Sequence, residues 1–388
     1  MLQLEFQMKD RYHFLFASDS FKGTLTCQDT IRLLTQAAQQ VFPDSVCEGI
    51  PVADGGEGTV DTVLAAEGGE LVSTTVHGPL MEERKANYGI ISGNRAVIEI
   101  SAASGLPLVP MDQRNPLLTT SYGTGELILD ALERGIRDFS VAIGGSATND
   151  GGMGFLSALG VRFLDQNGNI LEGRGESLDK VRSIDLSGLD PRIKNTRITV
   201  MCDVTNPLTG QTGATMTYGK QKGGTPDILE RLEAGMYNYR EVVFRKTGVD
   251  ADTIQGSGAA GGLGAALAIF LGGEMRSGIE TVLNLVHFKE RLSDVDLVIT
   301  GEGCADRQSC YGKVMQGVGQ HAKALDIPVI GLCGSLGEGY EELFKHGITK
   351  ILTTTNARLS PEEIMQRAEE LYLEGAIRMF EMIKSRGI

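Results

Sequence analysis

Short apolar runs followed by glycine-and-acid loops recur along this chain. Near the N-terminus, residues 12–17 form a compact apolar run that ends in the polar loop 18–24. Residues 26–41 then carry apolar side chains at helical spacing. The pattern predicts a strand, a loop and a helix, which together make one βα unit.

The C-terminal third repeats this pattern. Apolar runs at residues 295–300, 329–332 and 350–353 are typical of buried strands. Helical spacing over residues 317–324 and 361–383 predicts helices between and after them. Alternating short strands and helices predict a parallel sheet that is covered on both faces.

The middle of the chain follows a different pattern, in which long polar loops separate the predicted elements. These are strands at 97–100, 139–143 and 197–203 and a helix at 124–132. Because both ends share one βα pattern, we predict that the middle is inserted into a domain built from both termini. The predicted fold is α/β with two domains: a Rossmann-like parallel-sheet domain over residues 1–80 plus 286–388, and an inserted mixed α/β domain over residues 81–285.

Composition narrows the function classes. A length of 388 residues suits two domains, and a net charge of -14 argues against a nucleic-acid groove or an anionic membrane surface as partner. No run approaches the roughly 18 apolar residues of a membrane span, and the first ten residues lack the apolar core of a signal peptide. We therefore expect a cytoplasmic enzyme acting on small molecules, as a monomer or homodimer.

One glycine loop matches the dinucleotide-binding pattern G-x-G-x-x-G through Gly256, Gly258 and Gly261. That pattern needs a hydrophobic strand directly before it, and residues 249–255 are too polar. Two alternatives remain: the loop offers N–H groups to a nucleotide phosphate, or its glycines allow tight packing. No Walker A motif occurs, since Lys313 follows a glycine at the wrong spacing.

Two aspartates are candidates for the carboxylate that phosphoryl transfer needs near the attacking hydroxyl. Asp203 ends the predicted strand 197–203, and Asp306 lies just beyond the loop Thr300-Gly301-Glu302-Gly303. Each has an alternative role as the cap of a turn. Asp19 and Lys22 follow the first predicted strand, where α/β sheets bind ligands, but taken alone these two residues are better explained by an Asx turn with a solvated lysine.

Taken together, these segments resemble the type 1 glycerate kinases. The resemblance rests on strings that occur in the family's order over nearly the whole chain. They include Ser18-Asp19-Ser20-Phe21-Lys22, the segments 51–59, 119–128, 143–152, 202–208 and 258–262, and Thr300-Gly301-Glu302-Gly303 followed by Asp306, Gln308, Ser309, Gly312, Lys313 and Val314. Any one of these strings is weak, whereas their combination is specific.

The resemblance implies a kinase that phosphorylates D-glycerate to 2-phosphoglycerate with ATP and Mg²⁺, in a cleft between two α/β domains. Phosphorylation at the 3-hydroxyl is the alternative regiochemistry. Rivals from other classes are a nicotinamide-dependent hydroxy-acid oxidoreductase, supported only by the glycine loop, and a non-catalytic sugar-acid-binding protein.

On this hypothesis each candidate residue has an expected role. Asp203 or Asp306 orients and deprotonates the hydroxyl, while Lys22 and Lys313 neutralise phosphate or carboxylate charge. Arg114 holds the glycerate carboxylate through a bidentate pair. The other expected contacts are Asp19, Asp54, Asn149 and Asp150 for the substrate, Asp54 and Glu57 for the metal, and Gly256, Gly258, Gly261, Gly301, Glu302 and Gly303 for the nucleotide.

Overall fold

The computed structural model describes residues 11–21, 23–56, 58–91, 94–355 and 359–386. Its contacts divide the chain into two compact units. Unit 1 comprises Met1–Asp54, Ala65–Glu67 and Ile279–Ile388, and unit 2 comprises Gly55–Leu64 and Gly68–Gly278. Strand β3 (Glu70–His77), which precedes the predicted boundary at residue 80, pairs with β4 (Glu83–Ile91) in unit 2.

Unit 1 contains a five-stranded sheet in which every strand runs parallel to its neighbours. Its spatial order is β15-β13-β11-β1-β2, so the chain order along the sheet is 2-1-3-4-5, as in flavodoxin-like folds. In that topology the order reverses between β1 and β11, and ligands bind at the carboxyl ends of these strands. The strands are β1 (His13–Phe16), β2 (Val46–Gly49), β11 (Leu297–Thr300), β13 (Val329–Cys333) and β15 (Lys350–Thr353).

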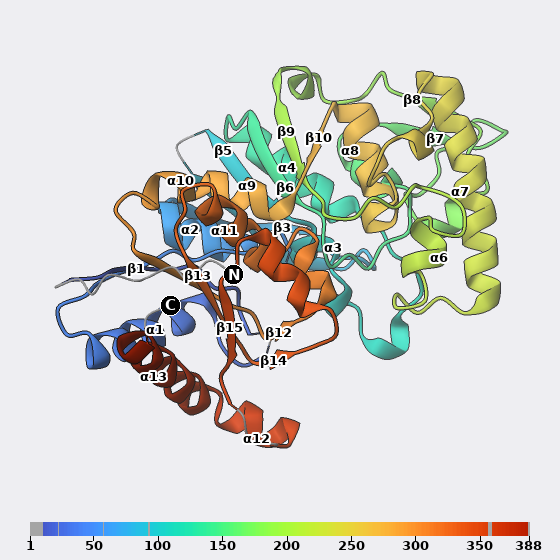
Figure 1. Ribbon diagram of the computed structural model, residues 1–388. Helices are drawn as coiled ribbons and strands as arrows, with labels where there is room; N and C mark the ends of the chain where they lie inside the picture. The colour runs from blue at the N-terminus through green and yellow to red at the C-terminus, as the bar shows by residue number, and fades with distance from the viewer. Residues whose placement is uncertain (1–10, 22, 57, 92–93, 356–358, 387–388) are drawn as a thin grey trace. The chain divides into compact units, whose positions relative to one another are not determined.

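Helices cover both faces of this sheet, as the apolar pattern predicts. Helix α1 (Cys27–Val41) begins at a capping box formed by Thr26 and Asp29, and it packs against α13 (Ala368–Arg386) (Figure 1). Side chains of both helices share one core with Ile330 of β13. Its neighbour Gly331 faces the other way, towards Met315 of α11 (Val314–Lys323), because side chains alternate along a strand.

The predicted helix 361–383 is interrupted. Helix α12 (Pro361–Gln366) begins at a capping box of Ser360 and Glu363 and ends at Arg367, whose backbone φ is -113° and ψ 19°. Helix α13 then begins at the next residue. The remaining regular elements of unit 1 are α9 (Gly278–Leu285), which starts at the last residue of unit 2, α10 (Phe288–Arg291), β12 (Cys304–Ala305) and β14 (Ser335–Leu336).

Unit 2 contains a six-stranded mixed sheet with the order β10-β9-β6-β5-β4-β3. Strands β3, β4 and β5 are antiparallel to one another in turn, whereas β5, β6, β9 and β10 are parallel. The parallel strands therefore bring their carboxyl ends to one edge of the sheet. Their bounds are β5 (Arg95–Glu99), β6 (Asp138–Ala142), β9 (Arg197–Met201) and β10 (Glu274–Arg276).

A single large core joins this sheet to its helices. Buried side chains from α4 (Tyr122–Glu133), α5 (Met153–Ala158), α7 (Pro226–Thr247) and α8 (Leu263–Leu271) belong to it. The shorter elements are α2 (Thr59–Glu67), α3 (Ile100–Ser104), α6 (Ala214–Tyr218), β7 (Arg162–Leu164) and β8 (Ser183–Asp185). In the described part of the chain, no helix is both long enough and apolar enough to cross a membrane.

Candidate functional site

Two of the predicted site residues lie at the switch point of the unit 1 sheet. Asp19 follows β1 and Glu302 follows β11, and these strands are neighbours. The Asp19 amide donates to the Gly301 carbonyl at 2.9 Å, which ties the two loops together. A second hydrogen bond of 2.8 Å runs from the Ala17 amide to the Ile299 carbonyl. The backbone thus fixes both carboxylates at the edge where this fold class binds ligands.

A cavity of about 460 Å³ opens in unit 1 at this point. Ligand pockets commonly range from roughly 300 to 1,000 Å³, so its size suits a small molecule. Its charged lining residues are Asp19, Asp54, Glu302, Asp306 and Lys313. Four carboxylates and one lysine in one cavity are suited to a phosphate group accompanied by a cation.

Glu302 has the most strongly perturbed environment of these acids. Its side chain is buried, and its Oε1 has no hydrogen-bond partner among the described residues. Burial is the main reason that the pKa of Glu302 is raised to about 7; the Ser309 hydrogen bond and the Lys313 ammonium oppose the shift, and the charges of Asp19 and Asp306 add to it. Lys313 Nζ lies 3.8 Å from Glu302 Oε2. A buried carboxylate oxygen without a partner is suited to binding a cation.

Asp306 also makes the turn contacts that the alternative role requires. Its Oδ1 accepts from the Gln308 amide at 2.7 Å, and its own amide donates to Ser309 Oγ at 3.0 Å. The carboxylate therefore caps the 3₁₀ helix Arg307–Cys310 while it lines the cavity. Lys313 directly precedes α11, so the lysine and the N-terminus of that helix place positive charge on the same side of the site.

Two glycines of the loop after β11 have different reasons to be glycine. A Cβ on Gly301 would lie 2.0 Å from the Leu332 carbonyl oxygen, so close packing against β13 excludes a side chain there. At Gly303 the nearest atom to such a Cβ is 3.8 Å away, and this residue lines the cavity. Of the two, Gly303 is the one that is placed to contact a ligand.

In unit 2, Asp150 is a buried acid. Its Oδ2 accepts from the Ser121 amide at 2.8 Å, the Ser121 hydroxyl at 2.7 Å and the Gly154 amide at 3.2 Å. Its Oδ1 accepts from the Gly152 amide at 3.0 Å. Burial raises the pKa of Asp150, and these four hydrogen bonds oppose that shift. These hydrogen bonds hold the loop before α5.

Lys222 is a buried lysine beside this loop, and it is not among the predicted site residues. Its ammonium donates to Ser146 Oγ at 2.9 Å and to the Thr148 carbonyl at 2.7 Å. Burial lowers the pKa of Lys222 to about 7, and the charge of Asp150 opposes the shift. In the sequence, Lys222 lies between Gly219 and the pair Gly223-Gly224. Neighbouring glycines do not distinguish a buried lysine from a solvated one.

Asn149 and Arg114 lie in the same unit. The Asn149 side chain is buried, and its Nδ2 donates to Thr215 Oγ1 at 3.0 Å. Arg114 is partly buried, its Nε donates to the Val109 carbonyl at 3.4 Å, and its backbone lies against Gly223, the residue after Lys222. Arg114 therefore borders the Lys222 turn, whereas Asn149 makes interior contacts.

The glycine loop at 256–261 packs closely against its own unit. A Cβ on Gly258 would lie 2.1 Å from the Pro207 carbonyl, and one on Gly261 would lie 2.0 Å from the Thr148 carbonyl. The Gly258 amide donates to the Asn206 carbonyl. No strand precedes this loop, because Ala251–Thr253 is a 3₁₀ turn. These contacts favour the packing alternative over phosphate binding for Gly256, Gly258 and Gly261.

The remaining predicted residues are Asp203, Lys22 and Glu57. Asp203 is exposed just beyond the end of β9, and its Oδ1 accepts from the Gly278 amide at 3.0 Å. Asp203 belongs to unit 2 and Asp306 to unit 1. Lys22 and Glu57 lie outside the described residues.

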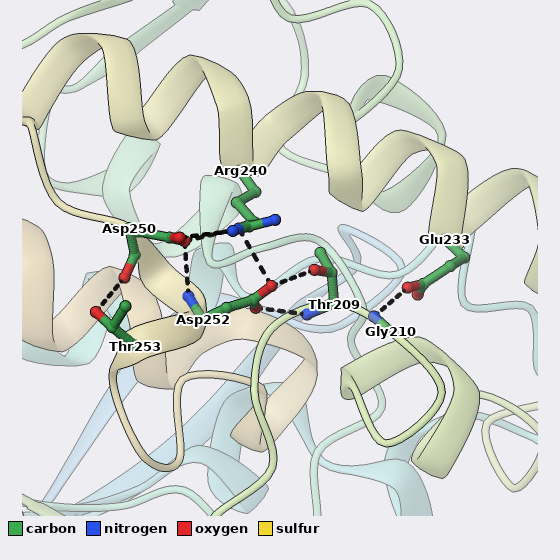
Figure 2. Close-up of polar contacts among 7 residues, drawn as sticks. All are labelled: Thr209, Gly210, Glu233, Arg240, Asp250, Asp252 and Thr253. Atoms are coloured by element: carbon green, nitrogen blue, oxygen red, sulfur yellow. Dashed lines mark hydrogen bonds and ion pairs between the residues drawn. The ribbon is translucent and has the colours of Figure 1, made fainter.

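A polar network in unit 2 anchors the loop that follows Asp203. Figure 2 shows Arg240 of α7 reaching Asp250, at 2.7 and 2.6 Å, and Asp252, at 3.1 Å. Asp252 in turn accepts from the amide and the hydroxyl of Thr209. Nearby, Glu233 of α7 accepts from the Gly210 amide at 2.6 Å. Arg240, through Asp252, and Glu233 therefore tie this loop to α7, the longest helix of the unit.

Comparison with known proteins places this architecture in a family. Residues 14–384 match the model of the glycerate kinase family. This chain belongs to the glycerate kinase family. The match spans both units, so it includes the residues that line the unit 1 cavity and the buried Lys222 of unit 2.

Individual relatives cover almost the whole chain. A glycerate kinase from Halalkalibacterium halodurans is 43% identical over 96% of this chain and 98% of its own length. A glycerate 2-kinase from Escherichia coli is 46% identical over 87% of this chain and 89% of its own length. A crystal structure from Salmonella typhimurium, of a protein provisionally assigned as glycerate kinase 2, covers 97% of this chain and 99% of its own, with 42% identity and a TM-score of 0.86.

Proposed function

We propose that this protein transfers the γ-phosphoryl group of ATP to a hydroxyl of D-glycerate and that the product is 2-phosphoglycerate. The proposal rests on membership of the glycerate kinase family and on the unit 1 cavity, whose four carboxylates and one lysine suit a metal-bound polyphosphate. The name of the Escherichia coli relative favours the 2-hydroxyl, and phosphorylation at the 3-hydroxyl is the alternative.

Magnesium fits the donor set of this cavity. Its acidic side chains supply hard oxygen ligands, and the buried Oε1 of Glu302 has no hydrogen-bond partner among the described residues. No three acidic, histidine or cysteine side chains in the described ranges are grouped to hold a metal by themselves. One or two carboxylates, Glu302 and Asp54, would therefore hold Mg²⁺ that shares its remaining sites with phosphate oxygens and water.

The chain's own residues would then divide the remaining work. Lys313 and the N-terminus of α11 would neutralise charge on the transferred phosphoryl group, and Gly303 would let it approach the backbone. Either Asp306 or Asp203 would orient the acceptor hydroxyl and take its proton, and Arg114 would bind the carboxylate of glycerate.

The direct test is ADP formation with D-glycerate, compared with L-glycerate, glycerol and sugar acids. We expect turnover with D-glycerate and little with the others, and absence of ADP formation with all of them would contradict the proposal. The product's phosphorus NMR spectrum separates the two regiochemistries, because a phosphate on carbon 2 couples to one proton and a phosphate on carbon 3 couples to two. The variants Asp203→Asn and Asp306→Asn test the base, since near wild-type kcat in both would remove both aspartates from that role.

A further inference from the structure

The unit 1 cavity has an apolar wall that its charged residues do not explain. One part comes from the loop after β1, through Phe21 and Leu25. The other comes from Ile364 of α12 and from Leu371 and Tyr372 of α13. This wall starts only two residues after Asp19, so apolar and charged surfaces share one cavity.

Backbone hydrogen bonds between Phe21 and Leu25 bring these two residues together at the cavity wall. The Phe21 amide donates to the Leu25 carbonyl at 2.8 Å, and the Leu25 amide donates back at 3.0 Å. Gly23 lies at the tip of this turn with φ of +81°, a conformation that glycine adopts without strain. The Phe21 ring meets the Tyr372 ring edge-on, with centroids 5.2 Å apart, so the two parts of the wall are in contact.

Helices α12 and α13 supply the rest of the wall. Leu371 and Tyr372 lie three and four residues after Ala368, on one face of α13, and Ile364 lies on α12 before the break. Ile364 remains 41% exposed although it is a large apolar side chain. An apolar residue that lines a cavity and stays exposed is available to pack against a ligand.

We propose that this wall binds the purine base of ATP, so that unit 1 is the nucleotide-binding unit of the protein. The inference deepens the proposed kinase function and rests on it. Of the two substrates, glycerate carries a carboxylate and two hydroxyls on three carbons and has no apolar surface to bury. The base is a flat ring whose removal from water onto aliphatic and aromatic side chains is favourable.

The neighbouring charges set the orientation of the nucleotide. With the base on the wall of Phe21 and Leu25, the triphosphate extends towards Lys313 and the carboxylates at the switch point. Glu302 and Asp306 line the same cavity, and Lys313 lies 3.8 Å from Glu302. The cavity volume of about 460 Å³ falls in the range of small-ligand pockets, roughly 300 to 1,000 Å³.

Adjacent residues of α12 provide a matched test. Ile364 lines the cavity and is 41% exposed, whereas Met365 is 61% exposed and is not among the residues that line it. Ile364→Asp and Met365→Asp add the same charge to the same helix, and both positions are exposed enough to preserve folding. We expect Ile364→Asp to weaken binding of MgATP to the whole protein about tenfold, measured by titration calorimetry, and Met365→Asp to leave it unchanged.

Inorganic tripolyphosphate with Mg²⁺ separates a base contact from a phosphate effect. We expect Ile364→Asp to leave tripolyphosphate binding unchanged, because that ligand has no base. Equal weakening of ATP and tripolyphosphate, or unaltered ATP binding in Ile364→Asp and in the pocket-filling variant Ala368→Phe, would overturn the inference. If ATP binding is unaltered in both variants, ADP formation from glycerate by the wild type would still leave the proposed function intact. A wild-type protein that binds no ATP would overturn the inference and the proposed function together.

Fluorescence offers an independent measurement. The chain contains no tryptophan, so Phe21→Trp creates a single reporter in the wall. We expect MgATP to change its emission and tripolyphosphate to leave it as it is. An emission spectrum that responds equally to both ligands, or to neither, would contradict a base bound at this position.

Discussion

Lys313 Nζ lies 3.8 Å from Glu302 Oε2, and this pair connects the start of α11 to the loop after β11. Lys313 is partly exposed, whereas Glu302 is buried. The lysine charge opposes the upward shift of the Glu302 pKa that burial causes. The pair therefore couples the charge state of the buried acid to a cation that also faces the cavity.

Replacing Lys313 tests both roles of this cation. In Lys313→Met we expect the KM for ATP to rise about tenfold, because a charge contact with phosphate is lost. We also expect the acid limb of kcat/KM to move to higher pH, since the pKa of Glu302 rises further without its neighbour. Steady-state rates across pH measure both effects. Lys313→Arg keeps the charge and is the control, and an unchanged KM in Lys313→Met would exclude a phosphate contact.

Glu302 itself predicts a dependence of stability on pH. Its folded-state pKa is about 7 and its ordinary value is 4.5, so between these values the folded state holds more protons than the unfolded state. Titration of Glu302 therefore lowers the free energy of unfolding as pH rises from about 5 to 7, by on the order of 1 kcal/mol per pH unit. Urea unfolding without Mg²⁺ should show the decline in the wild type, and Glu302→Gln should remove that part of it.

If Glu302 binds Mg²⁺, added metal should offset the loss of stability that occurs as pH rises. We expect added Mg²⁺ to stabilise the wild type well above pH 7 and much less near pH 5.5, where the carboxylate is protonated. Glu302→Gln should gain little at either pH. Equal stabilisation of both proteins at high pH would move the metal to other ligands.

Lys222 predicts the opposite slope in a higher pH window. Burial lowers its pKa to about 7 from an ordinary 10.5, so between these values the folded state holds fewer protons than the unfolded state. Its contribution to stability therefore rises as pH increases from about 7 to 10, and the gain is lost as pH falls. Comparing Lys222→Met with the wild type at pH 7, 8 and 9 isolates the slope, and identical slopes would show that Lys222 titrates normally.

Several features of the fold were predictable from the sequence because they depend on local patterns. Apolar runs indicated four of the five strands of the unit 1 sheet, all except β2, and helical spacing at residues 26–41 indicated α1. The break at Arg367 was not predictable, since the apolar spacing continues across it from Ile364 to Leu371. The β3–β4 hairpin was also missed, because its strands carry charged and polar residues on their exposed faces.

The residues of the candidate site were also predictable only in part. Asp19, Glu302, Asp306 and Lys313 lie beside glycine loops that follow strands, and the sequence identified them for that reason. It did not identify Lys222 or the wall residue Leu371, because the burial of a lysine and the place of a leucine beside a cavity depend on tertiary packing. Asp150 stays a predicted substrate contact, and its buried carboxylate also accepts four hydrogen bonds from the segments around it.

The network of Figure 2 predicts a stability effect without direct involvement in chemistry. Arg240→Ala removes the guanidinium from between Asp250 and Asp252, and we expect a loss of about 2 kcal/mol in the free energy of unfolding. Arg231→Ala on the same helix is the control, because its contact with Asp179 is 3.6 Å long and exposed, and should cost about 0.5 kcal/mol or less. Equal losses in denaturant unfolding would contradict a special role for Arg240.

Gly301 and Gly303 separate structural glycines from ligand-binding glycines. In Gly301→Ala the new methyl group would lie 2.0 Å from the Leu332 carbonyl, so β11 and β13 must move apart, and we expect a loss of about 2 to 3 kcal/mol in stability. In Gly303→Ala the nearest atom is 3.8 Å away, and the fold should be retained. If phosphate approaches the backbone at Gly303, that variant should instead raise the KM for ATP at unchanged melting temperature. Thermal unfolding and initial rates on both variants measure the difference, and a destabilised Gly303→Ala with a normal KM would assign both glycines to packing.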